Sequence, residues 1–230
     1  MTGWWIALAA ALLAVALGLG WLLVQRRTGG PGRATVSNLE DSTTLEDRTG
    51  AVRSVQTADL VLDEQALREI WSPMHLERLA RTYWRFLTRV TLGLIRVHYA
   101  PEERSVVFLG RPLKLLTFQA PEYEMDPERG LVRWRITRGL LVARRGRNGG
   151  GYLQIEVCRS PAADPGRVCL HVEVEVANFY PSIASGLGRW LYELTQSRIH
   201  VLITHGFLRS LARLDLAESK VRRLAPQNPT

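Results

Sequence analysis

The spacing of hydrophobic and polar residues divides the chain into segments of three kinds. From Trp4 to Val24, 21 residues carry no charged side chain. Over residues 72–94, apolar residues recur every three or four positions, which predicts a helix with one buried face. From residue 95 to residue 177 the period changes to two, which predicts antiparallel strands with one face toward a core and one toward water.

The first segment has the length and the ends of a membrane-spanning helix. A helix from Trp4 to Val24 is about 31 Å long, close to the thickness of the hydrocarbon layer of a bilayer. Trp4, Trp5 and Trp21 lie near its ends, where indole rings favour the headgroup region. A cleaved signal peptide is the alternative, but the apolar run is too long and no basic residue precedes it. We therefore expect residues 1–24 to form a transmembrane anchor.

Basic residues directly after this segment predict its orientation. Arg26, Arg27 and Arg33 all lie on its C-terminal side. The positive-inside rule then places the N-terminus outside and the remainder of the chain in the cytoplasm. We expect a single-pass protein of the cell membrane, with membrane lipids as partners of the anchor.

Composition divides the rest of the chain into a linker, a domain and a tail. Residues 25–50 are rich in Gly, Ser, Thr and charged residues without apolar periodicity, which predicts a flexible linker. Its arginines balance its acidic residues, so the net charge of +8 lies in residues 51–230, of which residues 51–217 form the expected domain. Residues 218–230 form a polar tail. The positive charge lacks the interleaved aromatic residues or the module of a nucleic-acid-binding protein, and it fits a solvated surface or an acidic membrane.

Two helices are expected near the start of the domain. Asp63 can cap a short helix over residues 64–71, and Ser72 can cap a second helix that begins at Pro73. The face of the second helix opposite its apolar side carries four arginines: Arg78, Arg81, Arg85 and Arg89. This arginine stripe is a candidate contact with anionic lipid, and an ordinary solvated helix face is the alternative.

Segments with a period of two are predicted as strands. They are residues 52–62, 95–99, 105–109, 113–118, 131–137, 152–158 and 168–177. Alternation this regular indicates an antiparallel sheet with unlike faces. The glycine-rich loop at 146–151 lacks the Lys-Ser/Thr pair of a phosphate-binding loop, so no nucleotide cofactor is expected.

A long helix is expected from about residue 185 to residue 216. One face is apolar throughout. The reverse face becomes apolar in its second half through Ile199, Ile203, Phe207, Leu211 and Leu214. A helix that is apolar on all sides must be covered on two sides. We expect it to lie on the concave face of the sheet and to meet a second helix, a partner protein or its counterpart in a homodimer.

A short stretch at the end of the last strand carries a family resemblance. Asn178-Phe179-Tyr180-Pro181 is followed by Tyr192 and His200. With the order strand, two helices, strands and long helix, it resembles uncharacterised bacterial members of the START-like helix-grip superfamily of polyketide cyclases and lipid-transfer proteins. The resemblance implies an α+β fold in which about six or seven antiparallel strands wrap around the C-terminal helix. It also implies an apolar ligand, such as a lipid or polyketide, between them.

Aromatic and polar residues near the expected sheet and last helix are candidates for ligand contact. They are Trp84, Trp134, Asn178, Tyr180, Trp190 and His205. Aromatic residues at core spacing often belong to the core alone, and that alternative stays open. His205 is also the candidate for proton transfer, although no Ser, Cys or Asp at a nucleophile's spacing accompanies it.

The two cysteines belong to the last two predicted strands. One register pairs Leu153 with Val174, Ile155 with Val172 and Val157 with Leu170. In that register Cys158 faces Cys169 and Glu156 faces His171, which would permit a disulfide or a zinc site. A cytoplasmic domain keeps thiols reduced, so we expect two free thiols and no metal.

Three hypotheses for function follow from these patterns. The first is a membrane-anchored domain, not an enzyme, that binds an apolar or amphiphilic ligand at the cytoplasmic surface. The second is an interaction scaffold that uses the C-terminal helix. The third is an enzyme that modifies a lipid or polyketide with His205 as its proton-transfer group.

Overall fold

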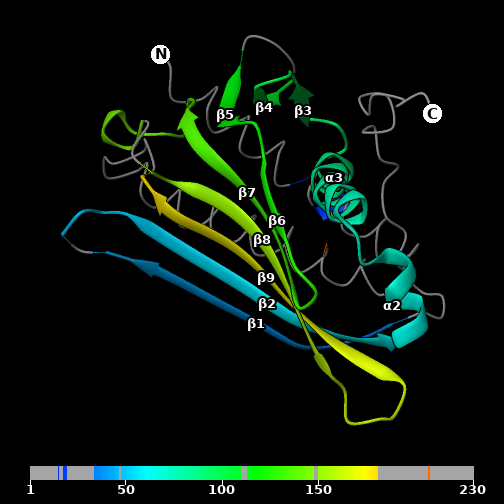
Figure 1. Cartoon of the computed structure of the whole chain (residues 1–230). Coiled ribbons are helices and arrows are strands. Elements are labelled where there is room, and N and C mark those ends of the chain that lie inside the picture. The colour runs from blue at the N-terminus through cyan, green and yellow to red at the C-terminus, as the bar shows by residue number, and fades with distance from the viewer. Residues whose placement is uncertain are drawn as a thin grey trace.

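The structure, a computed structural model, describes residues 34–46, 48–109, 113–147 and 150–180, together with Val15, Gly18, Leu19 and Phe207. These residues form an α+β fold with a nine-stranded antiparallel sheet and two α-helices (Figure 1). Apart from those four residues, the expected anchor, the long C-terminal helix and the polar tail lie outside the described residues. Within the described part of the chain, no helix has both the length and the apolar character needed to span a bilayer.

The elements follow one another in a simple order. They are β1 (Thr35–Leu45), β2 (Val52–Asp63), α2 (Glu64–Ile70), α3 (Pro73–Val90), β3 (Ile95–Tyr99), β4 (Glu103–Phe108), β5 (Lys114–Gln119), β6 (Glu122–Met125), β7 (Arg129–Arg138), a 3₁₀ turn η1 (Arg144–Gly146), β8 (Tyr152–Pro161) and β9 (Arg167–Phe179). The strands lie in the order β1-β2-β9-β8-β7-β5-β4-β3, and β6 also pairs with β7. The two helices lie together on one side of the sheet (Figure 1).

Helix boundaries follow the local signals of the sequence. The Asp63 carboxylate accepts hydrogen bonds from the backbone N–H groups of Gln65 and Ala66, which begins α2. Ser72 Oγ accepts a hydrogen bond from the backbone N–H of His75, and Pro73 occupies the first turn of α3. Both expected caps are confirmed.

The strand count differs from the expectation of six or seven because β1 and β6 were not predicted. β1 lies inside the segment that we expected to be a flexible linker, and that expectation is wrong for Thr35–Leu45. β1 is an edge strand that pairs with β2 alone, and most of its side chains are exposed. Such a strand needs no apolar alternation, because neither face is fully buried. Val36 and Leu39 pack against the core.

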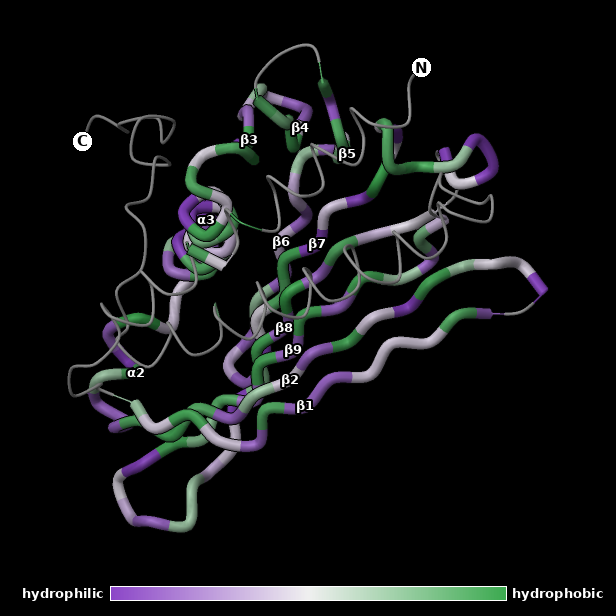
Figure 2. Tube along the Cα trace, turned by 180° about the vertical axis from the view of Figure 1, so that it is seen from behind, coloured by the Kyte–Doolittle hydropathy of each residue, from purple (hydrophilic) through white to green (hydrophobic). Residues whose placement is uncertain are grey.

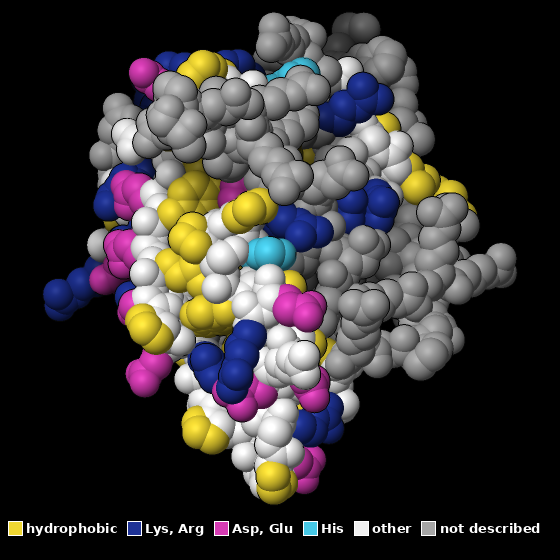
Figure 3. Space-filling view, turned by 45° about the vertical axis from the view of Figure 1, so that its right-hand side comes forward, with side chains coloured by type: hydrophobic (Ala, Val, Ile, Leu, Met, Phe, Trp, Pro, Cys, Tyr) yellow, Lys and Arg dark blue, Asp and Glu magenta, His cyan; other side chains and the backbone are white. Residues whose placement is uncertain are grey.

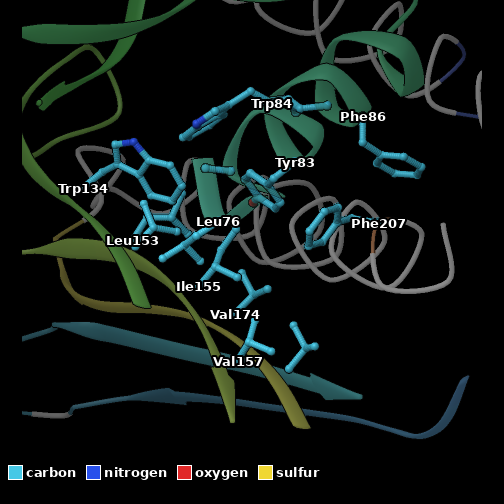
Figure 4. Packing of buried hydrophobic residues seen from close by; sticks show 14 of the residues in the cluster. Leu76, Tyr83, Trp84, Phe86, Trp134, Leu153, Ile155, Val157, Val174 and Phe207 are labelled. Carbon is cyan, nitrogen blue, oxygen red and sulfur yellow. The ribbon is translucent and has the colours of Figure 1, made fainter. Parts of the chain in front are cut away.

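Alternation gives the central strands two unlike faces, visible as alternating colours along the tube in Figure 2. The inner face is the one that carries α3 and the ring of Trp134, and the outer face is its opposite. Inner-face residues of neighbouring strands lie in rows, such as Val174, Ile155 and Val132. They form one hydrophobic cluster with the buried side of α3, which includes Leu76 and Tyr83 (Figure 4).

Phe207 is the described residue of the expected C-terminal helix. Phe207 is fully buried, and its ring meets that of Tyr83 on α3 edge to face, with 5.3 Å between centroids (Figure 4). Phe207 belongs to the reverse face that we expected to need a second cover. At this residue, helix α3 of the same chain supplies it.

The pairing of β8 with β9 differs from the expected register by two residues. Cys158 faces His171, Glu156 faces Glu173, and Cys169 faces Ser160. Both thiols are free. The expected pairing of Cys158 with Cys169 is therefore wrong. A shift of two leaves every side chain on its own face, so the alternation could not distinguish the two registers.

Candidate functional site

The inner face holds a group of aromatic rings that we call the aromatic wall. Its members are Tyr83 and Trp84 of α3, Phe118 of β5, Trp134 of β7, and Phe207. The rings of Trp84 and Trp134 meet at 5.3 Å and 76°, and Trp84 lies 5.6 Å from Phe118. All five side chains are buried. Trp84 Nε1 is also buried, and no acceptor among the described residues reaches it.

A small polar group interrupts the same face on the first two strands. Gln56 of β2 is 0% exposed, and its Nε2 donates a hydrogen bond of 2.8 Å to Ser54 Oγ. Ser54 Oγ lies 2.8 Å from Thr43 Oγ1 on β1. Gln56 Oε1 has no donor among the described residues. We call Thr43, Ser54 and Gln56 the polar end of the inner face.

The strand registers place the polar end and the aromatic wall on one surface. Gln56 pairs with Val174, Val174 with Ile155, and Ile155 with Val132, which is two residues before Trp134 on β7. Three strand spacings separate β2 from β7, or about 14 Å. A row of apolar side chains therefore connects a hydrogen-bonding group at one end to an aromatic group at the other.

Unpartnered polar atoms make this surface unusual for a core. A buried hydrogen-bonding group without a partner costs about 1–3 kcal/mol, so native cores rarely keep one. Gln56 Oε1 can accept a hydrogen bond, and Trp84 Nε1 can donate one. The surface can thus satisfy a molecule with an apolar body and a small polar group. We refer to the polar end, the aromatic wall and the row between them as the inner-face site.

The sequence-predicted ligand residues fall in different places. The structure brings Trp84 and Trp134 together in the aromatic wall. Asn178 is exposed at the end of β9, with a positive φ of 50°. Tyr180 lies under the guanidinium of Arg145, 5.3 Å from its ring centre. Neither of these two belongs to the inner-face site. Trp190 and His205 lie outside the described residues.

The four arginines of α3 do not form a free stripe. Arg81 pairs with Glu77, and its guanidinium lies 5.0 Å from the centre of the Tyr99 ring. Arg78 and Arg85 are half-buried and have interaction partners. Arg89 is the exposed member of the set. Of the four arginines, Arg89 at the C-terminal end of the helix is therefore the one most available for contact with lipid.

A second polar cluster surrounds Glu77, which is buried with its Oε2 unpartnered among the described residues. Burial raises the pKa of Tyr123 to about 12 and raises the pKa of Tyr99. Both phenols therefore stay protonated at neutral pH and are poor general bases. We assign no catalytic step to this cluster.

Sequence reasoning missed Gln56 and Ser54, although a signal was present. Inner-facing positions of β2 run Val52, Ser54, Gln56, Ala58, Leu60, so two polar residues occupy positions that alternation assigns to the core. A buried polar residue is more informative than a buried apolar one. Within the described ranges, no three His, Cys, Asp or Glu side chains are grouped so that they could hold a metal ion.

Comparisons with known proteins add little to this geometry. No family model matches the sequence, and no curated protein matches it. Solved structures that align with the chain include CalU16 from Micromonospora echinospora, with 12% identity over 76% of this chain and 86% of that chain and a TM-score of 0.27. Norcoclaurine synthase from Thalictrum flavum aligns with 12% identity over 72% and 97%, and a TM-score of 0.28. Human STARD10 aligns with 8% identity over 84% and 78%, and a TM-score of 0.30. Identities and TM-scores this low support no particular ligand or activity.

Proposed function

We propose that the domain is a helix-grip module that binds an amphiphilic, lipid-like small molecule on the inner face of its sheet. The observation that carries the proposal is the pair of buried atoms, Gln56 Oε1 and Trp84 Nε1, at opposite ends of an apolar row, neither of which has a partner among the described residues. The order strand, two helices and antiparallel strands supports the helix-grip arrangement. Phe207, buried against Tyr83, would cover part of the site.

Each end of the site would bind a different part of the ligand. The aromatic wall would contact the apolar body, because burial of apolar surface contributes about 25 cal/mol per Å². Gln56 would accept a hydrogen bond from a hydroxyl or amide of the ligand, with Ser54 holding the Gln56 side chain in place. A ligand with one small donor group fits this arrangement better than a hydrocarbon.

We further propose that the apolar segment from Trp4 to Val24 holds the domain at the cytoplasmic face of the cell membrane. The 21 uncharged residues and the arginines that follow them support this location. The membrane would then be the source of the ligand.

Lipid extraction with matched variants tests the proposal. The full chain is purified in detergent, its small molecules are extracted, and the extract is analysed by mass spectrometry. One molecular species should be enriched over the bulk membrane lipids. Gln56→Leu should lose that species, because the acceptor is gone while the volume is kept.

Gln154→Leu is the matched control, since Gln154 is a second buried glutamine on the outer face, 5% exposed. It should retain the enriched species. Extracts that match the bulk membrane, or equal loss in both variants, would contradict the proposal. The contact of Phe207 with Tyr83 lies within the chain, so it does not favour the scaffold hypothesis over ligand binding.

A further inference from the structure

Exposed leucines gather in the turns at one end of the sheet. The registers place the start of β3, the end of β4, the start of β5 and the end of β7 at this end. The turns there carry four exposed leucines: Leu92, Leu109, Leu113 and Leu140. We call these four residues the leucine end. Turns that face water normally carry Gly, Asn, Asp or Ser instead.

Two of these leucines are held in an unfavourable backbone conformation. Leu92 has a φ of 52° and Leu109 a φ of 53°, in the left-handed region that leucine rarely adopts. The two turns adjoin, since the backbone N–H of Leu109 donates a 2.8 Å hydrogen bond to the carbonyl of Leu94. Leu92 is 48% exposed and Leu109 is 69% exposed. Glycine or asparagine adopts this conformation at lower cost, and an exposed leucine buries little apolar surface, so leucine here strains the backbone without a compensating gain in burial.

Backbone strain and exposed apolar surface at the same residues indicate that these leucines serve an interaction with another molecule or surface. Basic residues flank them. Arg89, at the end of α3, is exposed, and Arg96 is exposed with its Nε bonded to the carbonyl of Gly93 at 3.0 Å. Basic and apolar side chains lie side by side on the side of the molecule that bears α2 and α3 (Figure 3).

We propose that the leucine end docks on an anionic membrane leaflet. Leu92 and Leu109 would enter the boundary between headgroups and acyl chains, while Arg89 and Arg96 would lie at the lipid phosphates. A second copy of the chain fits less well, because a symmetric contact would bring the same arginines toward one another. This surface lies apart from the inner-face site, so the proposal goes beyond ligand binding and does not depend on it.

The contact is compatible with the anchor proposed for Trp4–Val24, on which this step rests. β1 begins at the opposite end of the sheet, where Thr35 pairs with Val61. Residues 25–33 can reach about 33 Å when extended. β1, with 11 residues, is about 36 Å long. Residues 25–33 are thus long enough for the leucine end to touch the membrane if the strands are inclined to the bilayer normal.

Hydrogen exchange measured by mass spectrometry on the full chain tests the proposal. The protein is reconstituted into vesicles of phosphatidylcholine alone and into vesicles of equal parts phosphatidylserine and phosphatidylcholine. Peptides that contain Leu92 and Leu109 should exchange more slowly in the phosphatidylserine vesicles. The double variant Leu92→Asn, Leu109→Asn should lose this slowing, because asparagine keeps the backbone conformation and removes the apolar side chains.

Met74→Asn is the control variant, since Met74 is 44% exposed at the other end of α3. It should keep the slowing. In detergent the double variant should unfold at a higher temperature than the parent, which shows that it folds; a Leu92→Gly, Leu109→Gly variant repeats the test. Equal exchange in the two kinds of vesicle would overturn the proposal, as would slowing that survives in the double variant. Slowing that appears without lipid and grows with protein concentration would instead reveal a second copy and would also overturn it.

Discussion

The two faces of strands β2, β9, β8 and β7 differ in how completely their buried polar groups are hydrogen-bonded by the described residues. On the outer face, Arg53 Nε bonds Glu175 Oε1 at 2.7 Å, and Tyr152 donates to the other oxygen of Glu175 at 3.0 Å. On the inner face, no donor from the described part of the chain reaches Gln56 Oε1. Among the described residues, the outer face supplies partners for the polar groups of Glu175, whereas the inner face supplies no donor for Gln56 Oε1.

Two glutamines make this comparison direct. Gln154 Oε1 accepts hydrogen bonds from Arg133 Nε and Nη2 at 2.8 and 2.7 Å, and its Nε2 donates to Glu156 at 3.0 Å. Gln56 has the same side chain and similar burial, but within the described ranges its side chain makes one hydrogen bond, to Ser54. Residue type and burial are matched, so the difference lies in what each face provides.

The largest effect should come from neighbouring residues of β7 that point to opposite faces. Trp134→Ala removes a ring from the aromatic wall and should cost about 3–5 kcal/mol of unfolding free energy. Arg133→Ala removes a half-exposed side chain that lies over Tyr152 and donates to Gln154, and should cost about 1–3 kcal/mol. Denaturant unfolding of both variants measures the difference. Equal losses would show that the two faces do not differ as described.

The next effect should separate the two glutamines. Gln154→Leu deprives Arg133 of its acceptor and should destabilise the fold by about 1–3 kcal/mol. Gln56→Leu removes a buried oxygen that has no donor in the described part of the chain, so the free energy of unfolding of the ligand-free protein should stay the same or rise. Thermal unfolding after ligand removal provides the measurement. Comparable losses from both changes would mean that Gln56 is satisfied within the fold.

Acid should affect two carboxyl groups of the outer face in opposite directions. The hydrogen bond from Arg129 lowers the pKa of Glu156 below its usual 4.5, whereas burial raises the pKa of Glu173 above it. Glu156 therefore stabilises the fold at neutral pH, and this contribution disappears as the pH falls below 4.5. Glu173 opposes folding at neutral pH, and protonation removes that opposition as the pH falls through its raised pKa.

Substitution with glutamine should separate these two contributions. Glu156→Gln should lower the unfolding temperature at neutral pH, and Glu173→Gln should raise it, with both differences shrinking in acid. Unfolding temperatures measured across the acid range check both signs. Two shifts of the same sign at neutral pH would disprove the assignment.

The smallest effect should come from the two outer-face thiols. Cys158 and Cys169 are free and do not face each other. Replacement of both by serine should change the unfolding free energy by about 0.5 kcal/mol or less. Reductant should leave the unfolding temperature of the parent unchanged. A clear drop on reduction would mean that the thiols are joined.

Local signals predicted the parts of the fold that depend on neighbours in sequence. Asp63 and Ser72 cap the helices as expected, because a cap needs a side chain and a backbone N–H two or three residues away. The alternation around Trp134 predicted the faces of β7 correctly, since successive side chains of a strand must point to opposite sides.

Long-range pairing was beyond those signals. β1 has a polar sequence, and its place beside β2 depends on an open edge that the sequence of β1 does not reveal. The register of β8 against β9 was missed by two residues, a shift that preserves both faces. Gln56 was overlooked because its burial and its hydrogen bonding depend on β1 and on the residues that cover the inner face. Those residues lie far from Gln56 along the chain.

By itself, the sequence determined helices α2 and α3, most of the strands, the sidedness of the sheet and the uncharged N-terminal segment, because each follows from a period or a cap within a few residues. Tertiary structure alone decided which polar residues are satisfied, which aromatic rings meet, and which leucines stand together at one end of the sheet. Those properties depend on strand order, register and turn conformation, which bring together residues that lie far apart along the chain.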